Sequence, residues 1–149
     1  MPQVLIKITR NGFGSVQAFF GKQISSAKNL SGPLRQAGEY MMGSVRKNFR
    51  AGGRPKWRPL AKSTLKRKLS QGLSPLPLTG RTGRLQSQIT YKIFKNKFSI
   101  GTSIPYAPYH QFGTRSIPQR KFLIFQDEDL KLIESMILRN ILGQEYKGR

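Results

Sequence analysis

The feature that most constrains the fold is an apolar stripe between Ser31 and Arg50. Its members recur every three or four residues, which places them on one face of an α-helix. A helix with one apolar face has to pack that face against another element. We therefore predict a long central helix over 31–50, with a buried stripe formed by Leu34, Ala37, Met41, Val45 and Phe49.

The ends of this helix carry recognisable signals. Ser31 is predicted as the N-cap, and Pro33 suits the first turn because its missing N–H is not needed there. After Ala51, the pair Gly52-Gly53 is predicted to end the helix, since glycine readily takes the left-handed conformation found at helix C-termini.

The next segment, residues 51–83, is predicted to be an extended basic loop within the domain. A short helix from Ser63 to Ser70, capped by Ser63, is expected inside it, and Thr82–Ile89 is expected to form a helical turn. Loops of this length in a small domain are usually functional or disordered. The residues that break regular structure here are Pro55, Pro59, Pro75, Pro77, Gly72, Gly80 and Gly83.

Two elements are predicted near the N-terminus. Alternating apolar and polar residues indicate a strand over Val4–Thr9, and Asn11-Gly12 is a turn signal. The following segment, Gly14–Ile24, is predicted to be a short helix.

Further strands are predicted beyond residue 89. Thr90–Lys95 alternates, Asn96-Lys97 forms the turn, and Phe98–Thr102 returns antiparallel to it. Phe122–Phe125 is predicted to be a short apolar strand.

The chain ends with a second amphipathic helix. Asp127 or Asp129 is predicted to cap it, and acids in its first turn complement the helix dipole. The tail, residues 143–149, is expected to fray. The predicted fold of residues 1–149 is a single α+β domain, with a small, mostly antiparallel sheet packed against the central and C-terminal helices. The apolar stripe of the final helix is formed by Leu130, Ile133, Ile137 and Ile141.

Charge is distributed unevenly along the chain. The formal net charge is +21, from 27 basic and 6 acidic residues. Glu39 is the only acid before Asp127, so almost the whole positive field comes from one continuous part of the chain. Such a field attracts polyanions or acidic protein surfaces.

Few residues are suited to catalysis or to metal binding. His110 is the only histidine, and the nearest acid in sequence, Asp127, lies 17 positions away. The close acids Asp127, Glu128 and Asp129 are explained by helix capping, and the chain has no cysteine. We therefore predict no enzyme activity, no metal site and no cofactor. No stretch of 18 to 20 apolar residues indicates a membrane partner.

The basic segment 50–68 is the predicted contact surface. Arginine can bind phosphate or carboxylate with two hydrogen bonds, and lysine acts as a point charge. Trp57 either joins this surface or anchors the loop in the core, and the charges either bind a partner or form a solvated face. The candidate residues are Arg50, Arg54, Lys56, Trp57, Arg58, Lys62, Lys66, Arg67 and Lys68.

Three segments together resemble the phage virion morphogenesis family. They are Phe49–Lys68, Leu78–Ile89 and Ile100–Leu123, and their order and spacing match over about half of the chain. The family comprises tail-completion or neck proteins, typified by the G proteins of Mu-like phages and related to the tail completion protein S of P2-like phages. In the third segment, the order Tyr-Ala-x-x-His-Gln-Phe-Gly followed by Ile-Pro-x-Arg-x-Phe-Leu is the most specific part.

The resemblance implies a structural virion protein, assembled in the host cytoplasm and located at the head–tail junction or the head-proximal end of the tail. It implies a homo-oligomeric ring of six-fold or twelve-fold symmetry. The implied neighbours are other neck proteins, portal-side proteins and tail-tube proteins, with double-stranded DNA in the channel as a further partner. The residues expected to shape the fold or the ring interface are Tyr106, Tyr109, His110, Gln111, Phe112, Gly113, Pro118, Arg120 and Phe122.

Two other functions remain open from the residues alone. The basic segment 50–68 could bind DNA independently of sequence, which steep salt dependence would reveal. A metal-dependent nuclease would need His110, and loss of cleavage in His110→Ala would reveal it.

Overall fold

A computed structural model of the chain describes residues 5–9, 15–19, 30–94 and 97–142. The fold is α+β, as predicted, with a small antiparallel sheet and helices packed on it. The strands are β1 (Leu5–Thr9), β2 (Ser15–Phe19), β3 (Ile89–Phe94) and β4 (Lys97–Thr102). The helices are α2 (Ser31–Ala51), α3 (Lys62–Ser70), α4 (Arg84–Ser87), α5 (Ala107–Phe112) and α6 (Asp127–Leu142).

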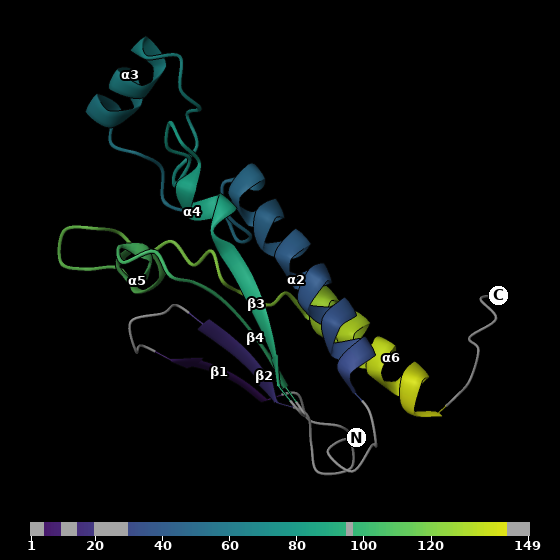
Figure 1. Cartoon of the computed structure of the whole chain (residues 1–149). Helices are drawn as coiled ribbons and strands as arrows, with labels where there is room; N and C mark the ends of the chain where they lie inside the picture. The colour runs from purple at the N-terminus through teal and green to yellow at the C-terminus, as the bar shows by residue number, and fades with distance from the viewer. Residues whose placement is uncertain (1–4, 10–14, 20–29, 95–96, 143–149) are drawn as a thin grey trace.

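The four strands form one sheet in the order β1-β2-β4-β3, and every neighbouring pair is antiparallel. Ile100 in β4 marks the register, because it lies opposite Val16 of β2 and opposite Tyr91 of β3. Helix α2 packs across β3 and β4, and α6 runs beside α2 (Figure 1). The long central helix therefore contacts both the sheet and the C-terminal helix.

The predicted apolar stripe of α2 is confirmed, since all five of its members are fully buried. Phe98 and Ile100 of β4 are also fully buried in this core. Gly38 permits close contact between α2 and β3, because a Cβ at this position would come within 2.4 Å of the Tyr91 ring. The packing distance between helix and sheet thus depends on a residue without a side chain.

The two predicted ends of α2 have different outcomes. Gly52 adopts the left-handed conformation with φ +67°, as predicted for the C-terminus. The predicted Ser31 N-cap is wrong: Ser31 is already helical, and the preceding residue, Leu30, is buried. The Leu30 carbonyl accepts the first helical hydrogen bond from the Leu34 N–H at 3.0 Å. Burial of an apolar residue, and not a side-chain cap, therefore determines where the helix begins.

The N-terminal predictions also divide. The strand predicted over Val4–Thr9 is confirmed for Leu5–Thr9, which form β1, and Val4 lies outside the described residues. The helix predicted over Gly14–Ile24 is wrong for residues 15–19, which form β2 between β1 and β4. Backbone pairing on both sides outweighs the weak local helical signal. The rest of that segment and the Asn11-Gly12 turn lie outside the described residues.

The predicted hairpin is confirmed by the pairing of β3 with β4. The turn predicted at Asn96-Lys97 is wrong for Lys97, which is the first residue of β4 and pairs with Phe94, and residues 95–96 lie outside the described part. The predicted C-terminal helix is confirmed as α6, whereas residues 143–149 lie outside the described part. Asp129 stabilises the start of α6, because its Oδ2 accepts a hydrogen bond from the Gln126 N–H at 2.9 Å. This is the carboxylate half of a capping box, with the acid in the first turn.

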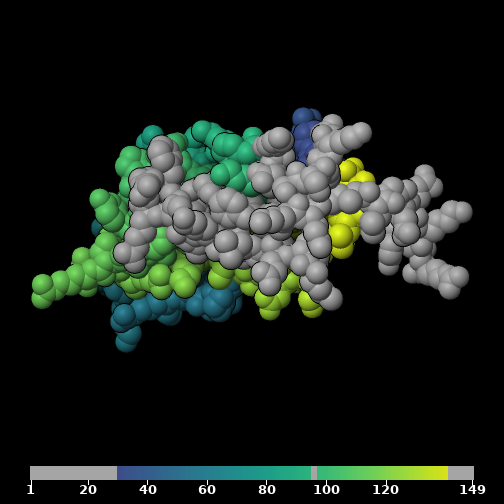
Figure 2. All heavy atoms as spheres, turned by 90° about the horizontal axis from the view of Figure 1, so that it is seen from below, coloured from purple at the N-terminus to yellow at the C-terminus, as the bar shows by residue number. Residues whose placement is uncertain are grey.

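Residues 51–83, which we call the arm, are not one extended loop. The predicted short helix is present as α3, although Ser63 does not cap it, because α3 begins at Lys62 and its start shows no side-chain cap. Lys68 joins the two sides of the arm by donating to the Leu76 and Thr79 carbonyls, each at 2.7 Å. The arm projects beyond the C-terminal end of α2 (Figure 1). Figure 2 shows the arm and the loop after α5 at the opposite end of the molecule from the visible part of α6.

The strand predicted over Phe122–Phe125 is wrong. The chain bends at Leu123, Phe122 and Leu123 are buried, and none of the described strands pairs with this segment. Its polar backbone groups instead bind side chains: Gln111 Oε1 accepts from the Phe122 and Leu123 N–H groups, and Asn48 donates to the Phe122 carbonyl. The helix α5, which carries Gln111, was not predicted.

No helix in the described residues is both long enough and apolar enough to cross a membrane.

Candidate partner-binding site

The structure brings the basic arm into contact with the segment 100–123, which contains α5 and which we call the aromatic segment. Arg120 donates from Nε to the Arg58 carbonyl at 3.1 Å and from Nη2 to the Pro59 carbonyl at 3.4 Å. Trp57 donates from Nε1 to the Lys121 carbonyl at 3.0 Å. Side chains from each segment therefore bind the backbone of the other, and they join Phe49–Lys68 to Ile100–Leu123, two of the segments that carry the family resemblance.

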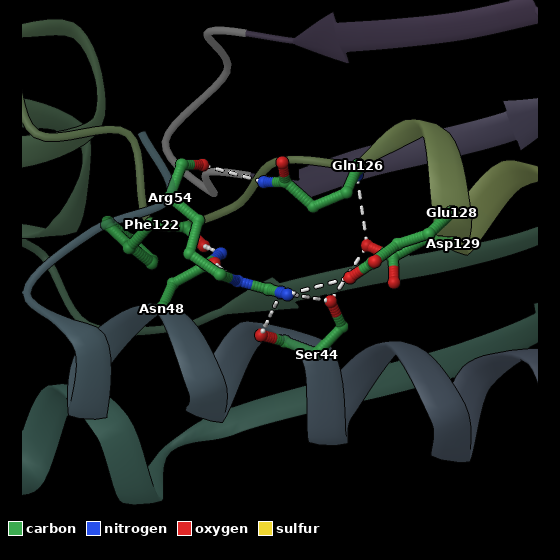
Figure 3. A network of polar contacts seen from close by, with 7 residues as sticks. All are labelled: Ser44, Asn48, Arg54, Phe122, Gln126, Glu128 and Asp129. Carbon is green, nitrogen blue, oxygen red and sulfur yellow. Dashed lines mark hydrogen bonds and ion pairs between the residues drawn. The ribbon is translucent and has the colours of Figure 1, made fainter. Parts of the chain in front are cut away.

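Arg54 lies in a polar network between α2 and α6 (Figure 3). Its Nε donates to Asn48 Oδ1 at 2.8 Å, its Nη2 donates to the Ser44 carbonyl and hydroxyl, and its Nη1 pairs with Glu128 at 3.0 Å. The Ser44 hydroxyl in turn donates to the buried Asp129 at 2.7 Å. The predicted contact residue Arg54 thus has its charge balanced within the chain.

Trp57 anchors the arm in the core, which is one of the two roles considered for it. The residue is buried, and its ring lies edge-on to Phe49 with ring centroids 5.8 Å apart. Phe122 packs on the other side of this cluster, with its centroid 5.5 Å from that of Phe49.

The remaining predicted basic residues fall into two groups. The Lys56 and Lys68 ammonium groups donate to backbone carbonyls, so they help to shape the arm. Burial lowers the pKa of Lys68 from its ordinary value. The exposed cations, which are directed to solvent, are Arg50, Arg58, Lys62, Lys66 and Arg67.

Gln111 is a structural clamp in the aromatic segment. It is almost fully buried, and its Nε2 donates to the Leu123 carbonyl at 2.8 Å while its Oε1 accepts two backbone N–H groups. Gly113 then ends α5 with φ +73°, and a Cβ there would lie 2.9 Å from the Gln119 backbone nitrogen. These two residues hold residues 111–123 as a compact turn.

The other members of the aromatic segment lie closer to the surface. Tyr106 and Tyr109 are 41% and 55% exposed, which leaves two large aromatic rings free to contact a partner. Phe112 and Pro118 are half-buried.

A cleft of about 550 Å³ separates the arm from α4 and α5. We call it the arm cleft. A second hollow of about 690 Å³ adjoins it and shares Leu60, His110 and Arg120 with it. No Asp or Glu lines either hollow. The cationic residues lining the arm cleft are Arg67, Lys68, Arg84 and Arg120, and the titratable His110 lines it as well.

His110 and Arg120 are electrostatically linked. Burial, and then the positive charge of Arg120, lowers the pKa of His110 below its ordinary value. Burial, and then Arg58, lowers the pKa of Arg120. The arm cleft is therefore a positive environment in which an anion would relieve repulsion.

The described residues contain no group of three or more His, Cys, Asp or Glu side chains that could hold a metal ion.

Sequence reasoning missed part of the arm cleft. Arg84 lines it from α4, and Thr79 and Leu78 line it from the turn before α4, yet none of them was proposed as a contact. These residues belong to the segment Leu78–Ile89, which carries part of the family resemblance. That resemblance was the available signal.

Comparison with known proteins agrees with the resemblance seen in the sequence. The phage virion morphogenesis family matches residues 13–142. One relative, the Mu-like prophage FluMu G protein 2 of Haemophilus influenzae, is 31% identical over 149 aligned positions, which cover 95% of this chain and 96% of the relative. No solved structure matches the chain.

Proposed function

Because the chain belongs to the phage virion morphogenesis family, we propose that it is a structural, non-enzymatic virion protein that completes the neck or tail and joins head to tail as a homo-oligomeric ring. The observation that carries this proposal is the match to the family over nearly the whole chain. The ring, its position at the head–tail junction and its assembly in the host cytoplasm are parts of the proposal.

The charge of the chain supports a role in an assembly. Six acids cannot neutralise 27 basic residues, so the isolated subunit carries a strong positive field. Contact with an acidic portal-side, neck or tail-tube surface, or with DNA in a channel, would relieve the self-repulsion.

The exposed aromatic residues support subunit contacts. Tyr106 and Tyr109 lie in and beside α5, on the same segment as the buried clamp Gln111. Tyrosine is enriched in protein interfaces because its ring buries a large area while its hydroxyl can still bind. A rigid segment that presents two such rings is suited to a ring interface.

Electron microscopy of particles assembled without this protein tests the proposed role. We expect filled heads beside separate tails of normal length if the protein joins the two structures. Overlong or frayed tails would indicate termination of tail growth instead. Intact, infectious particles would refute the proposal.

A charge-reversal experiment tests the contact surface of the arm. Arg54 and Lys56 are unsuitable because their side chains make hydrogen bonds within the chain, so we choose the exposed pair Arg58→Glu with Lys62→Glu. We expect this pair to block head–tail joining in an assembly assay. The matched pair Arg46→Glu with Lys47→Glu, on the exposed face of α2, should leave joining intact. Equal effects of both pairs would mean that only net charge matters.

Sequence-independent binding of DNA is the second candidate, favoured by the exposed cations of the arm. Under this alternative, the purified monomer binds duplex DNA with an affinity that falls steeply as salt rises. Weak binding with a shallow salt dependence would exclude it.

A further inference from the structure

Arg120 is the residue from which the inference starts. It is only 7% exposed, yet no carboxylate of the described residues lies within ion-pair distance of its guanidinium. Its hydrogen bonds go to the Arg58 and Pro59 carbonyls, which leave part of its five-donor fork unused. A buried charge is ordinarily paired, because desolvation without a counter-charge is costly. Arg120 therefore lacks the anionic partner that a buried arginine ordinarily has.

The residues around Arg120 are also basic and add to the unbalanced positive charge. Arg67, Lys68 and Arg84 line the same cleft, and the lining contains no Asp or Glu. His110 is also there, and its Nδ1 is a buried nitrogen without a hydrogen-bond partner. Lys68 already donates to the Leu76 and Thr79 carbonyls, so the donors left for a ligand in this hollow are those of Arg67, Arg84 and Arg120.

The shape and lining of the cleft distinguish among anions. Arg120 is buried, so an anion that binds it has to be carried on a narrow group that can enter the cleft. A carboxylate on a side chain can do this, whereas the phosphates of a duplex lie on a broad convex surface. The cleft also has apolar walls, which suit a peptide better than a nucleic acid backbone. These apolar residues are Leu60, Leu73, Leu78 and Leu85.

The arm cleft is not an isolated hollow. The arm cleft continues into the second hollow, which shares Leu60, His110 and Arg120 and adds Ile117 and Lys62. An extended segment could therefore pass along both hollows and over Arg120.

We propose that the arm cleft binds an extended acidic segment of another protein, with one carboxylate on the Arg120 guanidinium and apolar side chains against Leu60 and Leu78. The partner is defined by this chemistry: glutamate or aspartate next to apolar residues in an unfolded stretch. The inference concerns a binding site on the single chain and does not depend on ring formation.

The single histidine provides a site-specific probe. We would titrate the full chain with a soluble synthetic peptide of glutamate, leucine and serine, and follow the imidazole signals of His110 by NMR. Bound carboxylate should shift these signals and raise the pKa of His110, because it offsets the charge of Arg120. The same peptide with glutamine in place of glutamate should leave the signals unchanged.

Paired variants test the location. Arg67→Gln with Arg84→Gln removes two exposed cations from the cleft and should weaken peptide binding by about tenfold or more, since a charge-assisted hydrogen bond contributes about 1.5 kcal/mol or more. Arg35→Gln with Arg46→Gln removes the same charge from the exposed face of α2 and should leave the affinity unchanged. Circular dichroism checks that all variants remain folded.

Three results would overturn the inference. The first is the absence of any His110 shift with the acidic peptide. The second is equal weakening by the two variant pairs. The third is a short DNA duplex that shifts His110 at lower concentration than the peptide does, which would make nucleic acid the ligand. A chain that binds the peptide but fails to join heads to tails would instead refute only the proposed function.

Discussion

Two arginines from the basic and aromatic segments show opposite ways of burying a positive charge. Arg54 pairs with Glu128 at 3.0 Å and reaches the buried Asp129 through the Ser44 hydroxyl (Figure 3). Arg120 is mostly buried as well, but the described residues give it only carbonyl partners and cationic neighbours. The first charge is balanced inside the chain, and the second is not.

This difference separates structural cations from cations available to a ligand. The Arg54 network joins α2 to the start of α6, so its energy contributes to folding. The unbalanced charge of Arg120 lines a hollow, so the cost of burying it without a counter-charge is offset only when an anion binds there. The chain therefore contains structural cations, which are paired within the fold, and cations that remain available to a ligand. Contact with the acids of α6 distinguishes Arg54 from Arg120.

The largest expected effect comes from breaking the balanced network. Arg54→Met should lower the free energy of unfolding by roughly 3 kcal/mol, because Asn48 Oδ1 and the Ser44 carbonyl and hydroxyl lose the hydrogen bonds that Arg54 donates to them. Urea denaturation measures this loss. A change below about 1 kcal/mol would show that the network is not structural.

Glu128→Gln is a control that removes only the ion pair between Arg54 and Glu128. Glu128→Gln should cost less than about 1 kcal/mol, because the Glu128 side chain is 67% exposed and exposed ion pairs contribute little. If Glu128→Gln were as harmful as Arg54→Met, the exposed pair and not the buried hydrogen bonds would hold the network together.

A substitution of Arg120 tests the other arginine of the comparison. Arg120→Met should change the free energy of unfolding by less than about 1 kcal/mol, because two carbonyl hydrogen bonds are lost while a desolvated, unpaired charge is removed. The same urea experiment measures it. A loss as large as that of Arg54→Met would mean that Arg120 is structural too, and would remove the contrast between the two residues.

The smallest expected effect is a pH dependence from His110. Its pKa is lowered in the folded chain, so below the ordinary value of about 6.5 the unfolded chain binds more protons than the folded one. Stability should therefore fall as pH falls through this window and level off below the lowered pKa. Urea midpoints measured across the window test this sign.

His110→Asn should flatten this dependence, because the chain has no other histidine. A wild-type stability that rises on acidification would contradict the direction given for the pKa. Bound acidic peptide should weaken the dependence in the wild-type chain, because it raises the pKa of His110 again.

Local sequence patterns predicted the elements that depend on neighbouring residues. The stripe of α2, the hairpin of β3 and β4 and the helix α6 follow from periodicity and turn residues. The failures involve distant partners. β2 was predicted as a helix because its pairing with β4 joins residues about 80 positions apart. The segment at Phe122 was predicted as a strand because its apolar residues resemble one, whereas Gln111 and Asn48 supply its hydrogen bonds.

The segments that form the candidate site could be predicted from the sequence, but the positions of their side chains in space could not. The resemblance selected the arm, the segment around Arg84 and the aromatic segment. It did not indicate that Arg54 would be internal, that Trp57 would be buried, or that Arg84 and Arg120 would line one cleft.

The sequence by itself determined the positive charge, the long amphipathic helix and the family. Each of these follows from composition, from spacing within a few residues or from the order of short segments. Only the tertiary structure decided which cations remain available to a partner. Arg54 meets Glu128 across 74 positions of sequence, and Arg120 meets the backbone of the arm across more than 60. Neutralisation of charge depends on distance in space, and packing alone determines that distance.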